Sequence, residues 1–244
     1  MLKHLHRAPI LAFLVSGTAW GGYYPMYASW DQPNGIGSPI TLTYSYSNLF
    51  DGGIISATGQ SLSTDIMRSA FEQAFADYAA VLPIHFVEVA DHGPLPETGQ
   101  YDPTGLADIR IGVVPHVDDA NAYAYFPQDT SGLAGDVIFN GQRFGFGWSS
   151  VLFYAVAQHE LGHSLGMGHY IDSDDPGNSI LSKSAYTGPV FPLNNMMIAA
   201  LQDVYGAGTG AVTPLSATPV PEPGTWALLL GGLSILLLKG RKNT

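Results

Sequence analysis

Alternation of apolar and polar positions predicts short strands along the middle of the chain. Residues 41–47 (TLTYSYS) alternate within a run of β-branched and aromatic side chains, which is typical of a strand. Residues 107–114 (ADIRIGVV) alternate in the same way. Shorter strand candidates occupy residues 84–89, 122–126 and 136–139. The pattern therefore predicts five strands.

Three further segments repeat apolar side chains with the period of a helix. They are residues 63–82, 149–166 and 193–206. Ser63 or Thr64 can cap the first helix, Asn194 can cap the third, and Gly206 lies just past the end of the third. The order of a strand, a helix, several strands and two helices predicts an α+β domain over residues 36–206.

The charge distribution weighs against nucleic-acid binding. The 244 residues contain nine Lys and Arg against 20 Asp and Glu, which gives a net charge of −11. Several of the cations lie at the two ends of the chain, at Lys3, Arg7, Lys239, Arg241 and Lys242. Because so acidic a body repels phosphate backbones, we expect no nucleic-acid partner. The absence of cysteine excludes disulfides, zinc–thiolate sites and thiol catalysis.

The N-terminal segment has the features of a secretory signal peptide. A basic start is followed by an apolar stretch at residues 8–15 and by the small-residue triplet Gly17-Thr18-Ala19. We expect cleavage after Ala19, which makes residues 1–19 the signal peptide. A buried N-terminal helix is the alternative.

The C-terminal segment combines three features in a fixed order. Pro-Glu-Pro at residues 221–223 precedes an apolar run at residues 226–238, and basic residues follow that run. The run is short for a membrane span, and taken alone it also suits an internal helix. The order resembles the PEP-CTERM sorting signal of Gram-negative bacteria, over residues 220–244. The resemblance implies a transient membrane anchor, processing by an exosortase, and delivery to the cell surface or an extracellular matrix. Residues 207–219 are expected to form a linker.

The stretch QHELGHSLGMGHY concentrates candidate metal ligands. On a helix, His159 and His163 lie on one face, where two neutral imidazoles suit adjacent corners of a tetrahedral zinc site. Glu160 lies beside the first ligand, close enough to reach a zinc-bound water. Gly166 can adopt a positive φ, so the helix can end there and the chain can return to present His169. A structural histidine pair is the alternative, and the added glycine and third histidine make such a coincidence improbable. The spacing predicts a zinc site.

The segment HELGHSLGMGH resembles the zinc-binding motif of metzincins, and the surrounding chain is similar to their matrixin branch. The similar segments are residues 63–89, 107–113, 135–140 and 193–206. The resemblance covers residues 36–206 and implies a matrixin-like metallopeptidase domain, with a twisted five-stranded mixed sheet, three helices and an active-site cleft. It also implies a secreted zinc endopeptidase with one catalytic zinc, in which Glu160 is the general base that activates a zinc-bound water.

Two positions near the motif are expected to shape the substrate pocket. Leu181 stands where metzincins have a methionine beneath the zinc, and leucine can still provide an apolar floor. Tyr186 corresponds to the matrixin tyrosine that helps to wall the primed-side specificity pocket. An extended peptide or protein substrate is expected to pair with the edge strand near residues 121–125, and the protein is expected to be a monomer.

The other metal sites of the family are not preserved in the same way. The histidines of the vertebrate structural zinc would fall near Tyr123 and Ile138, which cannot serve, so we expect no second zinc. Asp136 and Asn140 are candidates for a calcium ion, and a solvated turn is the equal alternative.

These departures keep a second class of function open. The missing methionine and the missing structural-zinc histidines favour a non-catalytic zinc-binding surface or matrix protein on a metzincin fold. The three ligands, Glu160 and Gly166 favour catalysis, because a retired site has no reason to keep its base. A zinc hydrolase that acts on something other than peptides is the third interpretation.

Overall fold

A mixed sheet organises the computed structural model, which describes residues 22–91, 107–115, 120–141, 147–171, 179–181 and 192–215. The six strands lie in the order β4-β5-β3-β1-β2-β6. Their bounds are β1 (Ile40–Tyr46), β2 (Ile84–Glu88), β3 (Ile109–Val114), β4 (Ala122–Ala124), β5 (Val137–Asn140) and β6 (Ala211–Thr213). β4 pairs antiparallel with β5, and every other neighbouring pair is parallel.

The prediction of five strands is wrong by one. The extra strand, β6, lies inside the predicted linker at residues 207–219 and pairs with β2, where Val212 lies opposite Phe86. A strand of three residues among glycine, threonine and proline carries no period that a sequence pattern can reveal. Its formation depends on the open edge of β2 instead.

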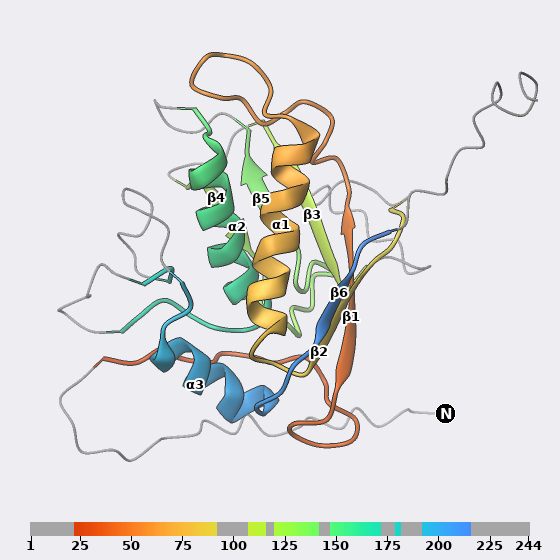
Figure 1. Cartoon of the computed structure of the whole chain (residues 1–244), viewed down its shortest axis with the longest axis vertical. Coiled ribbons are helices and arrows are strands. Elements are labelled where there is room, and N and C mark those ends of the chain that lie inside the picture. Colours follow the sequence, from red (N-terminus) through yellow and green to blue (C-terminus); the bar gives the residue numbers. More distant parts are fainter. Residues whose placement is uncertain are drawn as a thin grey trace, which may run out of the picture.

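The three predicted helices are confirmed, with slightly narrower bounds. They are α1 (Thr64–Ala79), α2 (Ser150–Ser164) and α3 (Asn195–Tyr205). Each is preceded by an N-cap residue whose side chain accepts a hydrogen bond from a backbone N–H of the first turn. The N-cap residues are Ser63, Ser149 and Asn194. α1 and α2 lie side by side across one face of the sheet, and α3 lies below them (Figure 1).

Buried aromatic rings join the two long helices to the sheet. Phe153 of α2 stacks on Phe139 of β5 with ring centroids 4.6 Å apart. Phe75 of α1 lies 4.3 Å from the Tyr44 ring of β1. Phe71 of α1 contacts both Phe139 and Phe153. Since each aromatic ring buries on the order of 150–250 Å², these contacts fix where α2 lies above the sheet.

The helices approach most closely where α2 has a glycine. The Tyr78 hydroxyl of α1 donates a hydrogen bond of 2.9 Å to the Gln158 carbonyl of α2. A Cβ at Gly162 would lie 2.7 Å from that hydroxyl oxygen. The glycine therefore makes room for Tyr78 one turn along the helix from its hydrogen bond.

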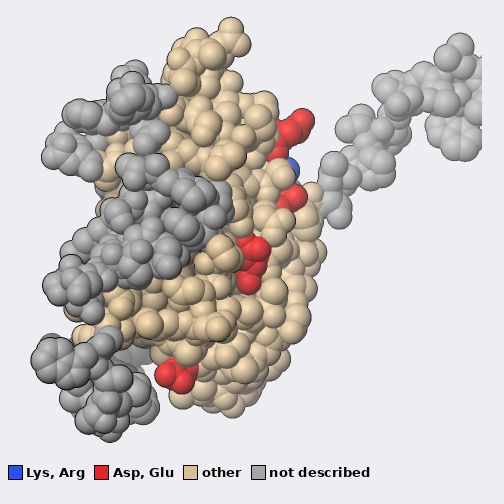
Figure 2. Space-filling view, turned by 60° about the vertical axis from the view of Figure 1, so that its left-hand side comes forward, with Lys and Arg blue, Asp and Glu red and all other residues tan. Residues whose placement is uncertain are grey.

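Several predicted features fall outside the described residues. They are the signal peptide at residues 1–19, the sorting signal at residues 220–244, and Tyr186. Among the described helices, none has the length and hydrophobicity needed to cross a bilayer. On the face shown in Figure 2, the described surface is largely neutral, with scattered Asp and Glu and very little Lys or Arg.

Gly162→Ala is expected to destabilise the protein by about 1–3 kcal/mol, because the added methyl group overpacks against Tyr78. Tyr78→Phe alone is expected to cost about 1 kcal/mol through the lost hydrogen bond. In the double variant the methyl group can occupy the space that the hydroxyl leaves. The double variant should therefore lose less stability than the two single variants lose together. Urea unfolding measures the three free energies, and strictly additive values would contradict this packing.

Candidate metal centre

The C-terminal half of α2 brings two histidines together inside the protein. His159 and His163 are 1% and 8% exposed. Their Nε2 atoms lie 3.0 Å apart, as expected for side chains one helical turn from each other. The predicted pairing on one helix face is confirmed.

Gly166 turns the chain back toward this pair. Its φ is +94°, a conformation that glycine adopts without strain. A Cβ at this position would lie 2.0 Å from the Ala28 carbonyl oxygen, so any other residue would also clash with backbone. After the turn, the Nε2 of His169 lies 3.1 Å from that of His159. The three predicted ligands therefore converge.

The spacing of the three nitrogens fits a zinc ion. Zinc–nitrogen bonds of about 2.0–2.1 Å in a tetrahedron place the ligand nitrogens about 3.3 Å apart. The observed separations of 3.0 and 3.1 Å are close to that value. In the described part of the chain, these three histidines are the group of His, Cys, Asp or Glu residues close enough to hold a metal ion.

Backbone carbonyls set the tautomer of both helical histidines. His159 Nδ1 lies 2.5 Å from the Ile180 carbonyl oxygen, and His163 Nδ1 lies 2.6 Å from that of Met167. Since a carbonyl can only accept a hydrogen bond, each Nδ1 must carry the proton and donate it. The lone pair of each ring is then on Nε2, which points at the other histidines.

Burial keeps both rings neutral. It lowers the pKa of His159 well below the usual value of 6.5, and it lowers the pKa of His163 to about 4. Neighbouring histidines add to the effect, while the hydrogen bonds to carbonyls oppose it. Both imidazoles are therefore in the ligand form at neutral pH before any metal arrives.

Glu160 and Leu181 lie next to the histidines, one on the helix and one beneath it. Glu160 is 1% exposed and follows His159 on α2. Leu181 is fully buried, and a Cβ at Gly162 would lie 3.2 Å from its Cδ1. Leu181 thus packs against the helix at Gly162, one residue before His163. The pocket roles of Leu181 and Tyr186 stay predictions.

The sequence did not reveal which groups hold the ligands. The carbonyls of Ile180 and Met167 carry no side-chain signal, and nothing in the residue pattern distinguishes them from other loop carbonyls. The peptide N–H of Tyr170 also donates to the Leu181 carbonyl at 3.2 Å, which ties the third ligand's neighbour to the same short segment.

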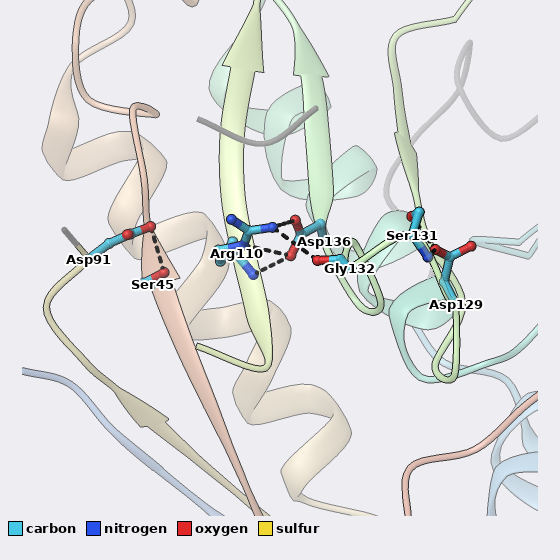
Figure 3. A network of polar contacts seen from close by, with 7 residues as sticks. All are labelled: Ser45, Asp91, Arg110, Asp129, Ser131, Gly132 and Asp136. Atoms are coloured by element: carbon cyan, nitrogen blue, oxygen red, sulfur yellow. Dashed lines mark hydrogen bonds and ion pairs between the residues drawn. The ribbon is translucent and has the colours of Figure 1, made fainter. Parts of the chain in front are cut away.

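Asp136, one of the two calcium candidates, lies in a buried ion pair (Figure 3). Arg110 Nη2 donates to Oδ2 at 2.5 Å, and Arg110 Nε and backbone N donate to Oδ1 at 3.2 Å. Burial raises the pKa of Asp136 to about 6, and the hydrogen bonds and charge of Arg110 oppose that rise. Asn140 donates from Nδ2 to the Ala120 carbonyl at 3.0 Å. A calcium ion would have to share the Asp136 carboxylate with Arg110, and calcium binding stays a prediction.

The two positions considered for a structural zinc lie opposite each other. Tyr123 of β4 and Ile138 of β5 are direct partners in the antiparallel ladder. Neither side chain offers a nitrogen or sulfur ligand, so this pair cannot hold zinc in the way that two histidines would.

Comparisons with known proteins identify relatives of the chain. A model of the matrixin family matches residues 52–206. Interstitial collagenase of Sus scrofa is 32% identical over 162 residues, which are 63% of this chain and 31% of that protein. Interstitial collagenase of Bos taurus is 29% identical over 166 residues, with the same two shares. Matrix metalloproteinase-20 of Homo sapiens is 28% identical over 158 residues, which are 62% of this chain and 30% of that protein. The chain thus spans about a third of the length of the curated relatives it matches.

His169→Ala is expected to weaken zinc binding by at least about 100-fold, because it removes a direct ligand. Titration against a chromophoric chelator measures the affinity. His85→Ala is the matched control: His85 lies in β2, outside the histidine group, and its loss should leave the affinity unchanged. Equal affinities in the two variants would contradict the assignment of His169.

Asp136→Ala is expected to cost about 3–5 kcal/mol of stability, since it leaves the buried Arg110 cation uncompensated. The double variant Arg110→Met/Asp136→Ala removes both charges and should recover much of that loss. Thermal unfolding compares the variants. The single variant Arg110→Met completes the comparison. If the double variant loses as much stability as the two single variants lose together, the ion pair is not the source of the effect.

Proposed function

The chain belongs to the matrixin family, and on that basis we propose that it is a zinc-dependent endopeptidase. One observation carries the proposal: the side chains of three histidines converge within a few ångströms, and two of them lie on the same helix as a buried glutamate. Three nitrogen ligands leave the fourth corner of a tetrahedral ion for water or substrate, as in catalytic zinc sites and not in closed structural ones.

Bound zinc would supply a Lewis acid that lowers the pKa of a water molecule and polarises the scissile carbonyl. The protein's own groups do the rest. Glu160 would accept the proton from the attacking water at its carboxylate and pass it to the leaving amine nitrogen. His159 and His163 would hold the ion through rings that the Ile180 and Met167 carbonyls fix in orientation. Zinc activation with Glu160 as general base is part of the proposal.

We also propose that an extended peptide substrate lies along β4. That strand is the last in the sheet on its side, and it contacts α2. Phe126, two residues beyond β4, lies edge-on to the His163 ring with centroids 5.9 Å apart. A peptide added at this edge would therefore run past the histidines, with main-chain hydrogen bonds supplying affinity that does not depend on sequence.

The opposite edge of the sheet suits attachment. β6 lies at the far side from β4, and just beyond it the Leu215 N–H donates to Glu88 Oε2 at 2.9 Å. We propose that residues 1–19 direct export and that residues 220–244 sort and anchor the protein at the envelope of a Gram-negative bacterium. The last described residue, Leu215, lies next to the β6 edge of the sheet.

Glu160→Ala is expected to keep one equivalent of zinc and to lose at least about 10²-fold in cleavage rate, because it removes the proton acceptor and not a ligand. Cleavage of an unstructured protein and zinc content are measured on the same samples. Chelation should abolish cleavage by the wild type, and added zinc should restore it.

Two outcomes of that experiment point away from the proposal. Undiminished hydrolysis by Glu160→Ala would contradict the role of Glu160. Wild-type protein that binds zinc but cleaves no peptide bond would favour the non-catalytic zinc-binding protein. Leu181 in the methionine position is the observation that keeps that second function open.

A further inference from the structure

Residues 22–31 run alongside the segment that carries His169, and we call them the N-terminal strap. Two isolated antiparallel bridges pair Tyr23 with Ile171 and Met26 with Met167. The Gly168 N–H donates to the Pro25 carbonyl at 2.7 Å, and the Ile171 N–H donates to the Tyr23 carbonyl at 2.9 Å. The strap therefore forms a short ladder with the chain that leaves the active-site helix.

The ladder brackets the third ligand. His169 lies past the end of α2, so no helical hydrogen bond fixes its backbone. Of its near neighbours, Gly168 and Ile171 donate to the strap, and Tyr170 donates to Leu181. The position of His169 is thus set by contacts between segments, and the strap provides two of them.

The strap also satisfies carbonyl groups at the end of α2. The last carbonyls of a helix have no partner within it. The Trp30 indole Nε1–H donates to the Ser164 carbonyl at 2.9 Å, and the Tyr27 N–H donates to the Gly166 carbonyl at 2.8 Å. The Tyr205 hydroxyl donates to the Leu165 carbonyl at 2.9 Å and accepts a hydrogen bond from the backbone N–H of Trp30 at 3.0 Å.

Close packing couples the strap to the turn after the helix. A Cβ at Gly166 would meet the Ala28 carbonyl, and a Cβ at Gly168 would lie 2.3 Å from the Tyr27 ring. The Tyr27 ring in turn lies 5.3 Å from Phe126, which contacts His163. Any shift of the strap would therefore displace the turn between His163 and His169.

We propose that the N-terminal strap is a positioning element of the zinc centre, which holds His169 where it completes the three-nitrogen site. The inference rests on the proposed zinc binding and extends it to residues outside the matched family region at 52–206. The strap does not touch the metal. It acts by fixing the backbone on either side of a ligand, as hydrogen-bonding partners beyond the direct ligands do in other metal sites.

The test compares Tyr27→Pro with Tyr27→Ala in the full chain. Both changes remove the same half-exposed ring, and only proline removes the N–H that donates to the Gly166 carbonyl. Met26 is already in a bridge, and proline favours an extended residue before it. We expect zinc affinity to be at least tenfold weaker in Tyr27→Pro than in Tyr27→Ala, by chelator competition. The visible spectrum of the cobalt-substituted variants should show the changed ligand geometry. Equal affinities would overturn the proposal.

Trp30→Phe provides an independent variant in case the proline blocks folding. It keeps an aromatic ring and removes the donor to Ser164, together with the part of the indole that packs at Gly135. Zinc affinity should fall in this variant too, and an affinity equal to that of the wild type would overturn the proposal.

Amide hydrogen exchange gives a readout that involves neither variants nor catalysis. Because binding couplings are reciprocal, removing zinc from the wild type should speed exchange at Gly168, Ile171 and Tyr27. Amides of the β1–β3 ladder, which pairs with neither the strap nor the segment that carries His169, serve as the control. Exchange that is the same with and without zinc at these three amides would overturn the proposal.

These outcomes separate the strap from the proposed function. Zinc binding without cleavage in the wild type would contradict the endopeptidase alone. Intact cleavage with equal zinc affinities in Tyr27→Pro and Tyr27→Ala would contradict the strap alone.

Discussion

The metal centre depends on two hydrogen bonds from imidazole Nδ1 atoms to backbone carbonyls. These bonds leave the Nε2 lone pairs of His159 and His163 pointing at a common position. The acceptors, Ile180 and Met167, lie on chain that follows α2 and not on the helix itself. The helix therefore provides the spacing of the two ligands, but the segments that return beneath it provide their orientation.

The packing around these two histidines positions α2 on the sheet and the returning chain against α2. Stacked rings such as Phe139 and Phe153 fix α2 on the sheet, and Gly162 lets Tyr78 bind the helix at Gln158. Leu181 packs against the helix at the same glycine. Burial then lowers the pKa of both histidines, so the metal-free protein holds uncharged ligands in a confined space. Bound zinc would offset the cost of that arrangement, which would link metal affinity to the stability of the fold.

The sequence predicted what is periodic or local. The four-residue spacing of the histidines, the positive φ at Gly166, and the caps Ser63 and Asn194 follow from local geometry, and all are confirmed. Contacts between segments distant in the chain were not predictable. β6 is three residues without a period, and it became a strand because β2 offered an edge. The ion pair of Arg110 with Asp136, whose partners are 26 residues apart, and the pairing of residues 23–27 with 166–171 leave no mark in a single sequence.

Anomalous diffraction at the zinc absorption edge, from crystals of the zinc-loaded protein, tests the central claim most directly. The account predicts one strong peak within about 2.0–2.1 Å of the Nε2 atoms of His159, His163 and His169, with both Nδ1 atoms still bonded to the Ile180 and Met167 carbonyls. A peak bound through Nδ1, a peak at Asp136, or a site that lacks His169 would contradict it.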